Sequence, residues 1–223
     1  MTGYFEKSFE VDGETRTAKI YISPEAPIRS FFTVIAVPDG VDTNDFLLES
    51  GWRDIADANE ECLVVLEPGN NPWGEAEEEQ AYINAVIDFY KRNNYFSIFG
   101  VHYFVGYDAG GTALEAWAAA NPLFVISQTY IETESLSDDY YAQFATKYFD
   151  GKSSGYTPIE IPDEIKITYN QVPVPTWYIN SNLSKVAAGI EYWKDANDCV
   201  ADSVINCLLY TSDAADEEDS VDL

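Results

Sequence analysis

The sequence predicts an α/β protein in three layers, with a mostly parallel sheet and helices on both of its faces. Short apolar runs of strand length recur along the chain and end at turn signals such as Pro-Gly. Segments with the apolar spacing of helices separate these runs. Before residue 200 there is no repeat, linker or change of composition, so we expect one domain.

Three strands are predicted in the first half of the chain. Residues 15–22 (TRTAKIYI) alternate as in a half-buried strand, whereas 31–37 (FFTVIAV) and 62–66 (CLVVL) are apolar runs typical of buried strands. Between the last two, Asp42 or Thr43 is expected to cap a helix. The predicted buried face of this helix consists of Phe46, Leu47, Trp52, Ile55 and Ala56.

The alternation of helices and strands continues in the second half. A helix is expected over residues 75–92, because its first turn is acidic, its last turn is basic and its apolar residues share one face. That face consists of Tyr82, Val86, Phe89 and Tyr90. The remaining predicted elements are a strand at 98–105, a helix at 112–120, a strand at 123–127, a helix plus loop at 135–154, a strand at 174–179 and a closing helix at 184–197.

The charge balance excludes some partners. Twelve basic residues against 39 acidic ones give a formal net charge of -27, which repels nucleic acids and anionic membranes. No apolar stretch is long enough to span a bilayer, and no signal peptide is visible, so the compartment stays open. Cys62, Cys199 and Cys207 are too few and too scattered for a disulfide framework or a zinc site.

The last residues differ in character from the rest. Residues 207–217 (CLLYTSDAADE) read like the translation of a sequencing-library adapter, whereas the alternative is a genuine acidic tail. We therefore expect one domain over residues 1–206 that is incomplete at its C-terminal end. Residues 207–223 are expected to be a disordered artefact.

Residues 104–114 (FVGYDAGGTAL) predict a sharp strand-turn-helix connection with Asp108 at its tip. Glycine is needed beside such a tip, because larger side chains would collide with the neighbouring strand or helix. Gly106, Gly110 and Gly111 meet this need. The turn is expected to lift Asp108 above the carboxyl ends of the strands, where open α/β sheets place their sites.

The segment GYDAGGTALEAWAAANP resembles the nucleophile elbow of α/β-hydrolases, most nearly that of polyhydroxybutyrate depolymerase-like and feruloyl-type esterases. GWRDIADANEECLVVLEP and VPVPTWYINSNLSKV resemble the segments before and after the elbow in that group. The resemblance covers about residues 15–200 and implies an esterase-like hydrolase. In this chain, Asp108 stands where the group has its nucleophilic serine.

The same resemblance implies the other site residues. The backbone N–H of Ala109 and a residue near Gly40 are expected as oxyanion donors. The loop after strand 174–179 normally carries the triad acid, but residues 180–183 contain no carboxylate. The triad histidine would lie beyond residue 200. The chain's one histidine, His102, lies within the strand before the elbow and is expected to be a core residue without a catalytic role.

Three interpretations of Asp108 remain open. It is an N-cap of the following helix in a relative that has lost catalysis; it takes part in conventional ester hydrolysis by some route; or it is a nucleophile that attacks saturated carbon, as in haloalkane dehalogenases. Ala109 favours the esterase group over the dehalogenases, whose elbows usually have tryptophan at that position.

Other ligands are less well supported by the sequence. The spacing of Gly106, Gly110 and Gly111 does not match a dinucleotide fingerprint, and dispersed carboxylates with one histidine form no spaced metal-ligand set. We expect no cofactor and no metal. A small acyl ester or a carbohydrate is the expected ligand class, and a protein that only binds a ligand or partner is the alternative to an enzyme.

Overall fold

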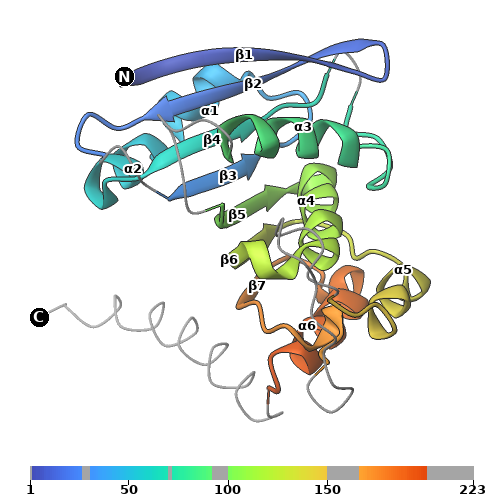
Figure 1. The fold of residues 1–223 in the computed structure, drawn as a ribbon. Helices are drawn as coiled ribbons and strands as arrows, with labels where there is room; N and C mark the ends of the chain where they lie inside the picture. Colours follow the sequence, from blue (N-terminus) through green and yellow to red (C-terminus); the bar gives the residue numbers. More distant parts are fainter. Residues whose placement is uncertain (1, 27–30, 70–71, 92–99, 150–165, 200–223) are drawn as a thin grey trace, which may run out of the picture.

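A computed structural model describes residues 2–26, 31–69, 72–91, 100–149 and 166–199. In these ranges, seven strands form one sheet in the order β1-β2-β4-β3-β5-β6-β7 (Figure 1). The strands are β1 (Gly3–Val11), β2 (Glu14–Ile22), β3 (Phe32–Ala36), β4 (Cys62–Leu66), β5 (His102–Tyr107), β6 (Val125–Ile131) and β7 (Thr176–Ile179). The α-helices are α1 (Thr43–Glu49), α2 (Trp52–Asn59), α3 (Gln80–Lys91), α4 (Asp108–Ala120), α5 (Asp138–Ala142) and α6 (Ala187–Ala196).

Five neighbouring strands, β4, β3, β5, β6 and β7, are parallel. β1 and β2 form an antiparallel hairpin at one side of the sheet, and β2 pairs antiparallel with β4. The carboxyl ends of the five parallel strands therefore meet at one edge of the sheet, and the predicted fold class is confirmed. We call this edge the carboxyl edge.

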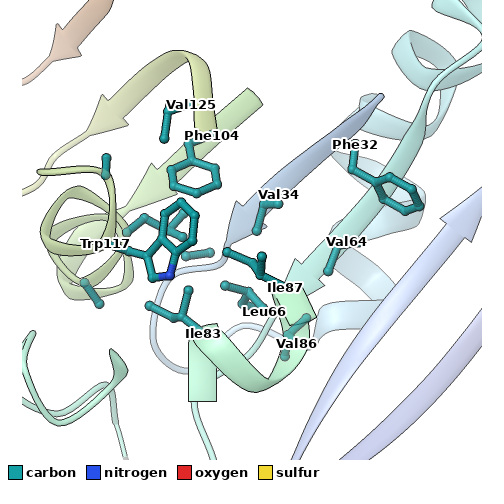
Figure 2. Close-up of a cluster of buried hydrophobic side chains, with 14 of the residues drawn as sticks. Phe32, Val34, Val64, Leu66, Ile83, Val86, Ile87, Phe104, Trp117 and Val125 are labelled. Carbon is teal, nitrogen blue, oxygen red and sulfur yellow. The ribbon is translucent and has the colours of Figure 1, made fainter. Parts of the chain in front are cut away.

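Two apolar clusters pack on opposite faces of the sheet, as expected when consecutive residues of a buried strand point to opposite sides. On one face, Val34 and Val64 join side chains of α3 and α4, among them Trp117 (Figure 2). On the other face, Ile35 and Val65 join residues of α1 and α2. This arrangement gives the three predicted layers.

The predicted helix that starts at Asp42 or Thr43 is in fact two helices. Asp42 does cap α1, since its carboxylate accepts hydrogen bonds from the N–H groups of Asn44 and Asp45. Gly51, with a φ of 79°, then breaks the helix before α2 begins. A single buried face through Ile55 was therefore the wrong expectation, and Ile55 is 46% exposed.

Several predicted boundaries also move. α3 begins at Gln80 rather than at residue 75, so the acidic residues before it form turns and not a first helical turn. β5 begins at His102 and not at residue 98, and residues 98 and 99 lie outside the described ranges. Residues Pro122–Phe124 form a 3₁₀ turn, which moves the strand predicted at 123–127 to Val125–Ile131.

The two ends of the chain differ from the expectation in other ways. β1 was not predicted at all. The closing helix is a 3₁₀ turn, Leu183–Val186, followed by α6. The helix plus loop predicted at 135–154 contains α5 and a 3₁₀ turn, Gln143–Ala145, and its last residues lie outside the described ranges. The domain end predicted at 206 and the tail 207–223 also lie outside them. Among the helices that the structure describes, none has the length and apolar character to cross a membrane.

Candidate active site

The connection between β5 and α4 is a sharp turn with Asp108 at its tip. The backbone passes from an extended Tyr107 (φ -113°, ψ 141°) to a left-handed Asp108 (φ 46°) and then directly into the helix. A positive φ is uncommon for a residue other than glycine, and aspartate tolerates it better than most. Asp108 and Ala109 are exposed at the carboxyl edge of the sheet. The helix has Tyr107 as its N-cap, without a capping side-chain hydrogen bond, so Asp108 is not the N-cap of α4, and the loss of catalysis that was expected together with capping stays a prediction.

Glycine is sterically required on both sides of this turn. A Cβ atom at Gly106 would overlap the backbone of Gly111, and one at Gly111 would lie 2.8 Å from the carbonyl carbon of Gly106. A Cβ atom at Gly110 would lie 2.7 Å from the indole of Trp73. The predicted reason, close approach of the strand and the helix, therefore agrees with the geometry at Gly106 and Gly111, whereas at Gly110 the side chain of Trp73, from the loop before α3, excludes a Cβ atom. We call residues 106–111 the elbow.

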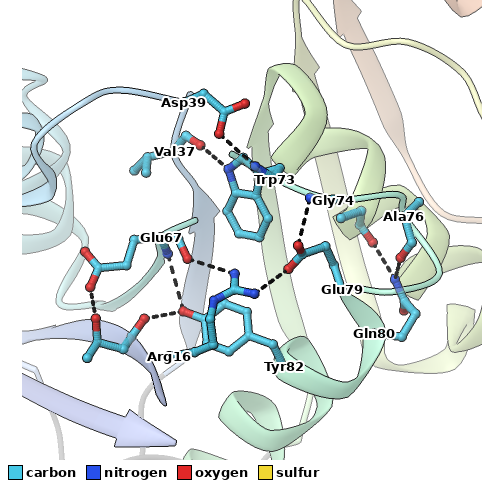
Figure 3. A network of polar contacts seen from close by, with 12 residues as sticks. Arg16, Val37, Asp39, Glu67, Trp73, Gly74, Ala76, Glu79, Gln80 and Tyr82 are labelled. Atoms are coloured by element: carbon cyan, nitrogen blue, oxygen red, sulfur yellow. Dashed lines mark hydrogen bonds and ion pairs between the residues drawn. The ribbon is translucent and has the colours of Figure 1, made fainter. Parts of the chain in front are cut away.

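The indole of Trp73 packs against the elbow at Gly110. Its indole Nε1–H donates a 2.8 Å hydrogen bond to the carbonyl of Val37, and its backbone N–H donates one of 2.9 Å to the Asp39 carboxylate (Figure 3). Val37 and Asp39 follow β3, the strand next to β5 in the sheet. Trp73 thus ties the loop after β3 to the elbow on β5.

A second carboxylate lies beyond β6, on the other side of the elbow. Glu132 follows the last residue of β6 with a φ of 54°. Its carboxylate accepts hydrogen bonds of 2.8 Å each from the backbone N–H and the hydroxyl of Ser181, in the loop after β7. The sequence did not predict this residue, because the strand was expected to end at residue 127 and the triad acid was expected only after β7.

The electrostatic surroundings of Asp108 are acidic. Partial burial of the carboxyl and the negative charges of Asp39 and Glu132 raise the pKa of Asp108 above its ordinary value. The positive charge of Lys185 acts in the opposite direction, but it is itself paired with Glu134 at 2.9 Å. Three carboxylates from the ends of β3, β5 and β6 thus share this part of the edge.

The predicted oxyanion donors lie at the same edge, after neighbouring strands. Ala109 stands in the first turn of α4, and Gly40 lies in the exposed turn after β3 with a φ of 74°. Their role as a pair of donors stays a prediction.

The loop after β7 is occupied by amide and hydroxyl groups instead of an acid. The Asn180 side chain donates a 2.8 Å hydrogen bond to the carbonyl of Thr133, and Asn182 accepts one from the backbone N–H of Ser184. These contacts order the loop and hold it against the residues that follow β6.

His102 is a core residue, as predicted. Its ring is fully buried, its Nδ1 lies 2.6 Å from the hydroxyl of Tyr90, and it stacks on Phe104. Burial, with a small contribution from Lys91, lowers the pKa of His102 to about 3. The ring is therefore neutral at ordinary pH. It lies at the amino end of β5, whereas Asp108 follows the carboxyl end of that strand.

A separate cavity of about 330 Å³ opens further along the same edge, between the β1–β2 turn and the start of α3. In its wall, Arg16 forms an ion pair of 3.0 Å with Glu79, and its guanidinium lies 4.1 Å from the ring centre of Tyr82 (Figure 3). In the part of the chain that the structure describes, no three His, Cys, Asp or Glu side chains are grouped to hold a metal ion.

No protein-family model matches the sequence, and no curated protein matches it significantly. Solved structures do match the fold. Est1E from Butyrivibrio proteoclasticus is 13% identical, with a TM-score of 0.56 over 86% of this chain and 85% of that one. A mutant of the feruloyl esterase module from Clostridium thermocellum, complexed with sinapinate, is 13% identical, with a TM-score of 0.54 over 89% of this chain and 73% of that one. The chain therefore has the fold of α/β-hydrolases, and the predicted resemblance is confirmed at the level of the fold.

Proposed function

We propose that this chain is an esterase-like protein of the α/β-hydrolase fold in which Asp108 replaces the serine nucleophile, and that it is weak or inactive as an ester hydrolase. The observation that carries this proposal is the left-handed, exposed Asp108 at the tip of a glycine-lined elbow. The turn has the shape that presents a nucleophile, but the side chain that it presents is a carboxylate.

A carboxylate at this point is poorly suited to ester hydrolysis. Attack by Asp108 on an ester carbonyl would give an anhydride, and the weakly basic carboxylate, with a reference pKa of about 3.9, is a better leaving group than the alkoxide of the ester. The acyl group would therefore return to the alkoxide more readily than it would stay on the protein.

The groups around Asp108 do not stabilise an oxyanion or act as a general base for ester hydrolysis. Asp39 and Glu132 place negative charge near Asp108, where an ester's developing oxyanion would need positive charge. The chain's single histidine, His102, is buried and neutral in the core. These features support a protein in which the elbow has a structural role and no catalytic one. The carboxyl edge of such a protein would bind a small ligand such as an ester or a sugar.

The proposal is tested with p-nitrophenyl acetate on the purified chain, on Asp108→Asn and on Asp108→Ser. We expect all three proteins to release nitrophenol without saturation by the substrate, and little faster than the buffer alone. Saturable hydrolysis by the parent chain that Asp108→Asn abolishes would contradict the proposal, because it would make Asp108 a working ester nucleophile. Saturable hydrolysis that neither substitution changes would also contradict it, since catalysis would then come from other residues.

One observation favours a second candidate, a hydrolase of non-ester substrates. The Asp108 carboxylate is exposed at the tip of the elbow, where it is open to attack saturated carbon. A carboxylate oxygen would form a C–O bond with an alkyl halide while the C–halogen bond breaks and the halide leaves. Mass spectrometry of the intact chain after incubation with 1-bromobutane distinguishes this candidate: a butyl adduct that is absent in Asp108→Asn supports it, and an unmodified chain excludes it.

A further inference from the structure

The elbow helix α4 carries a carboxyl group that has no part in the candidate site. Glu115 lies two turns after Asp108 on this helix and is 0% exposed. It is buried where α4 meets three elements from later in the chain: α5, β7 and α6. In the part of the chain that the structure describes, no lysine or arginine is paired with it.

Three donors converge on one oxygen of this carboxyl. Glu115 Oε1 accepts hydrogen bonds from the Tyr141 hydroxyl at 2.6 Å, from the Trp193 indole N–H at 3.0 Å and from the Tyr178 hydroxyl. Each donor comes from a different element, namely α5, α6 and β7. We call Glu115, Tyr141, Tyr178 and Trp193 the Glu115 cluster.

The other oxygen is left without a partner. Glu115 Oε2 is buried, and no described group forms a hydrogen bond with it. α6 packs closely against the Oε1 side of the cluster through Gly189, where a Cβ atom would lie 2.7 Å from Glu115 Oε1 and 3.0 Å from the Tyr141 hydroxyl. A negative charge on this carboxyl would therefore have hydrogen-bond donors at only one of its two oxygens.

We propose that Glu115 is a proton-dependent lock, which holds α5, β7 and α6 against the elbow helix while it is protonated and weakens this contact when it ionises. Burial costs the neutral acid less than the ionised form, whose charge is shared by both oxygens but meets hydrogen-bond donors only at Oε1. The contact that it controls also bears on the elbow's surroundings, because the loop after β7 supplies Ser181, which binds Glu132.

The groups around Glu115 do not offset the cost of burying its ionised carboxyl. The titratable side chains that face it are Tyr130 from β6, Tyr141 from α5, Tyr178 from β7 and Tyr192 from α6, and the charge of Glu115 contributes to a raised pKa in each. Burial raises the pKa of Glu115, and the hydrogen bonds from Tyr141, Tyr178 and Trp193 only partly oppose this rise.

Because the pKa of Glu115 is raised in the folded chain, the stability that this group contributes decreases as pH rises. The folded chain holds the Glu115 proton more tightly than the unfolded chain does. Stability from this group is therefore complete below the ordinary glutamic acid pKa of about 4.3. It is lost as pH rises from that value through the folded pKa. In that window the equilibrium constant for unfolding rises by up to about tenfold per pH unit from this one group.

Hydrogen exchange on the full chain tests the proposal, with the intrinsic pH dependence of exchange removed. We expect opening of β7 and α6 to become more frequent as pH rises above the ordinary glutamic acid range, while α3 and β4 change less. Glu115→Gln keeps the shape and the acceptor oxygen but cannot ionise, so this dependence should disappear. The exposed Glu49→Gln, on the opposite face, is the matched control and should behave as the parent chain.

Two results would overturn the proposal: equal pH dependence in the parent and in Glu115→Gln, or a pH dependence that spreads evenly over the sheet. If Glu115→Gln fails to fold, Tyr178→Phe serves instead. It removes one donor that favours the ionised carboxyl and so raises the folded pKa further, and the increase of α6 opening with pH should therefore continue to a higher pH than in the parent chain. No change in that pH would likewise refute the lock.

Discussion

Trp73 lies directly against the backbone of Gly110, such that a Cβ atom at residue 110 would be 2.7 Å from both Cε2 and Nε1 of its indole. The same hypothetical atom would lie 3.0 Å from the Cβ of Ala36 at the end of β3. The shape of the elbow therefore depends on a side chain in the loop before α3 as well as on the local glycine pattern.

Gly110→Ala should lower the free energy of unfolding by about 1–3 kcal/mol, because the methyl group overpacks the contact with Trp73. Urea denaturation measures this loss. In a double-mutant cycle with Trp73→Phe, which removes Nε1, the penalty of Gly110→Ala should shrink. Strictly additive losses in the cycle would mean that Trp73 is not the group that excludes a side chain at position 110.

The pKa of Asp108 provides a second prediction. Carbon-13 NMR of the aspartate carboxyl groups should show one that titrates above the usual aspartate range and disappears in Asp108→Asn. Glu132→Gln removes a neighbouring negative charge and should lower this pKa. Glu10→Gln, an exposed change on the β1–β2 hairpin, is the control and should leave it unchanged. If the pKa of Asp108 is the same in Glu132→Gln as in the parent chain, the charge of Glu132 does not act on Asp108.

His102 predicts a loss of stability at acid pH. Its folded pKa of about 3 is below the usual value of about 6.5, so the unfolded chain binds the proton more readily. Stability from this group is present above pH 6.5 and is lost as pH falls toward 3. In His102→Phe, the free energy of unfolding should fall less steeply than in the parent chain as pH decreases from 6.5 to 3. This difference in slope is expected even if the substitution changes the free energy at neutral pH. Parallel curves for the two proteins would show that His102 is accessible to protons in the fold.

Local features of the sequence predicted the elbow well. The order of strand, turn and helix, and the close approach of Gly106 and Gly111, depend on contacts between residues that are close in the chain, whereas the need for glycine at 110 comes from the distant Trp73. The parallel order of the central strands followed from the alternation of apolar runs and amphipathic segments, which the sequence displays directly.

Features that depend on distant contacts could not be predicted. Glu115 looks like an ordinary helical glutamate, and its partners Tyr178 and Trp193 are 63 and 78 residues away. Glu132 was missed because a 3₁₀ turn at Pro122–Phe124 delays β6 and carries its end to residue 131. β1 escaped detection because it is an edge strand, half of which stays exposed, so its apolar pattern is weak.

The elbow exposes the side chain of residue 108 at the carboxyl edge of the sheet, and the proposed function depends on this claim. Replacing Asp108 with cysteine in a Cys199→Ser, Cys207→Ser background tests this claim, because the remaining Cys62 is buried. Under native conditions, maleimide should label Asp108→Cys and leave Cys62 unmodified. Labelling of residue 108 only after denaturation, together with Cys62, would contradict the claim.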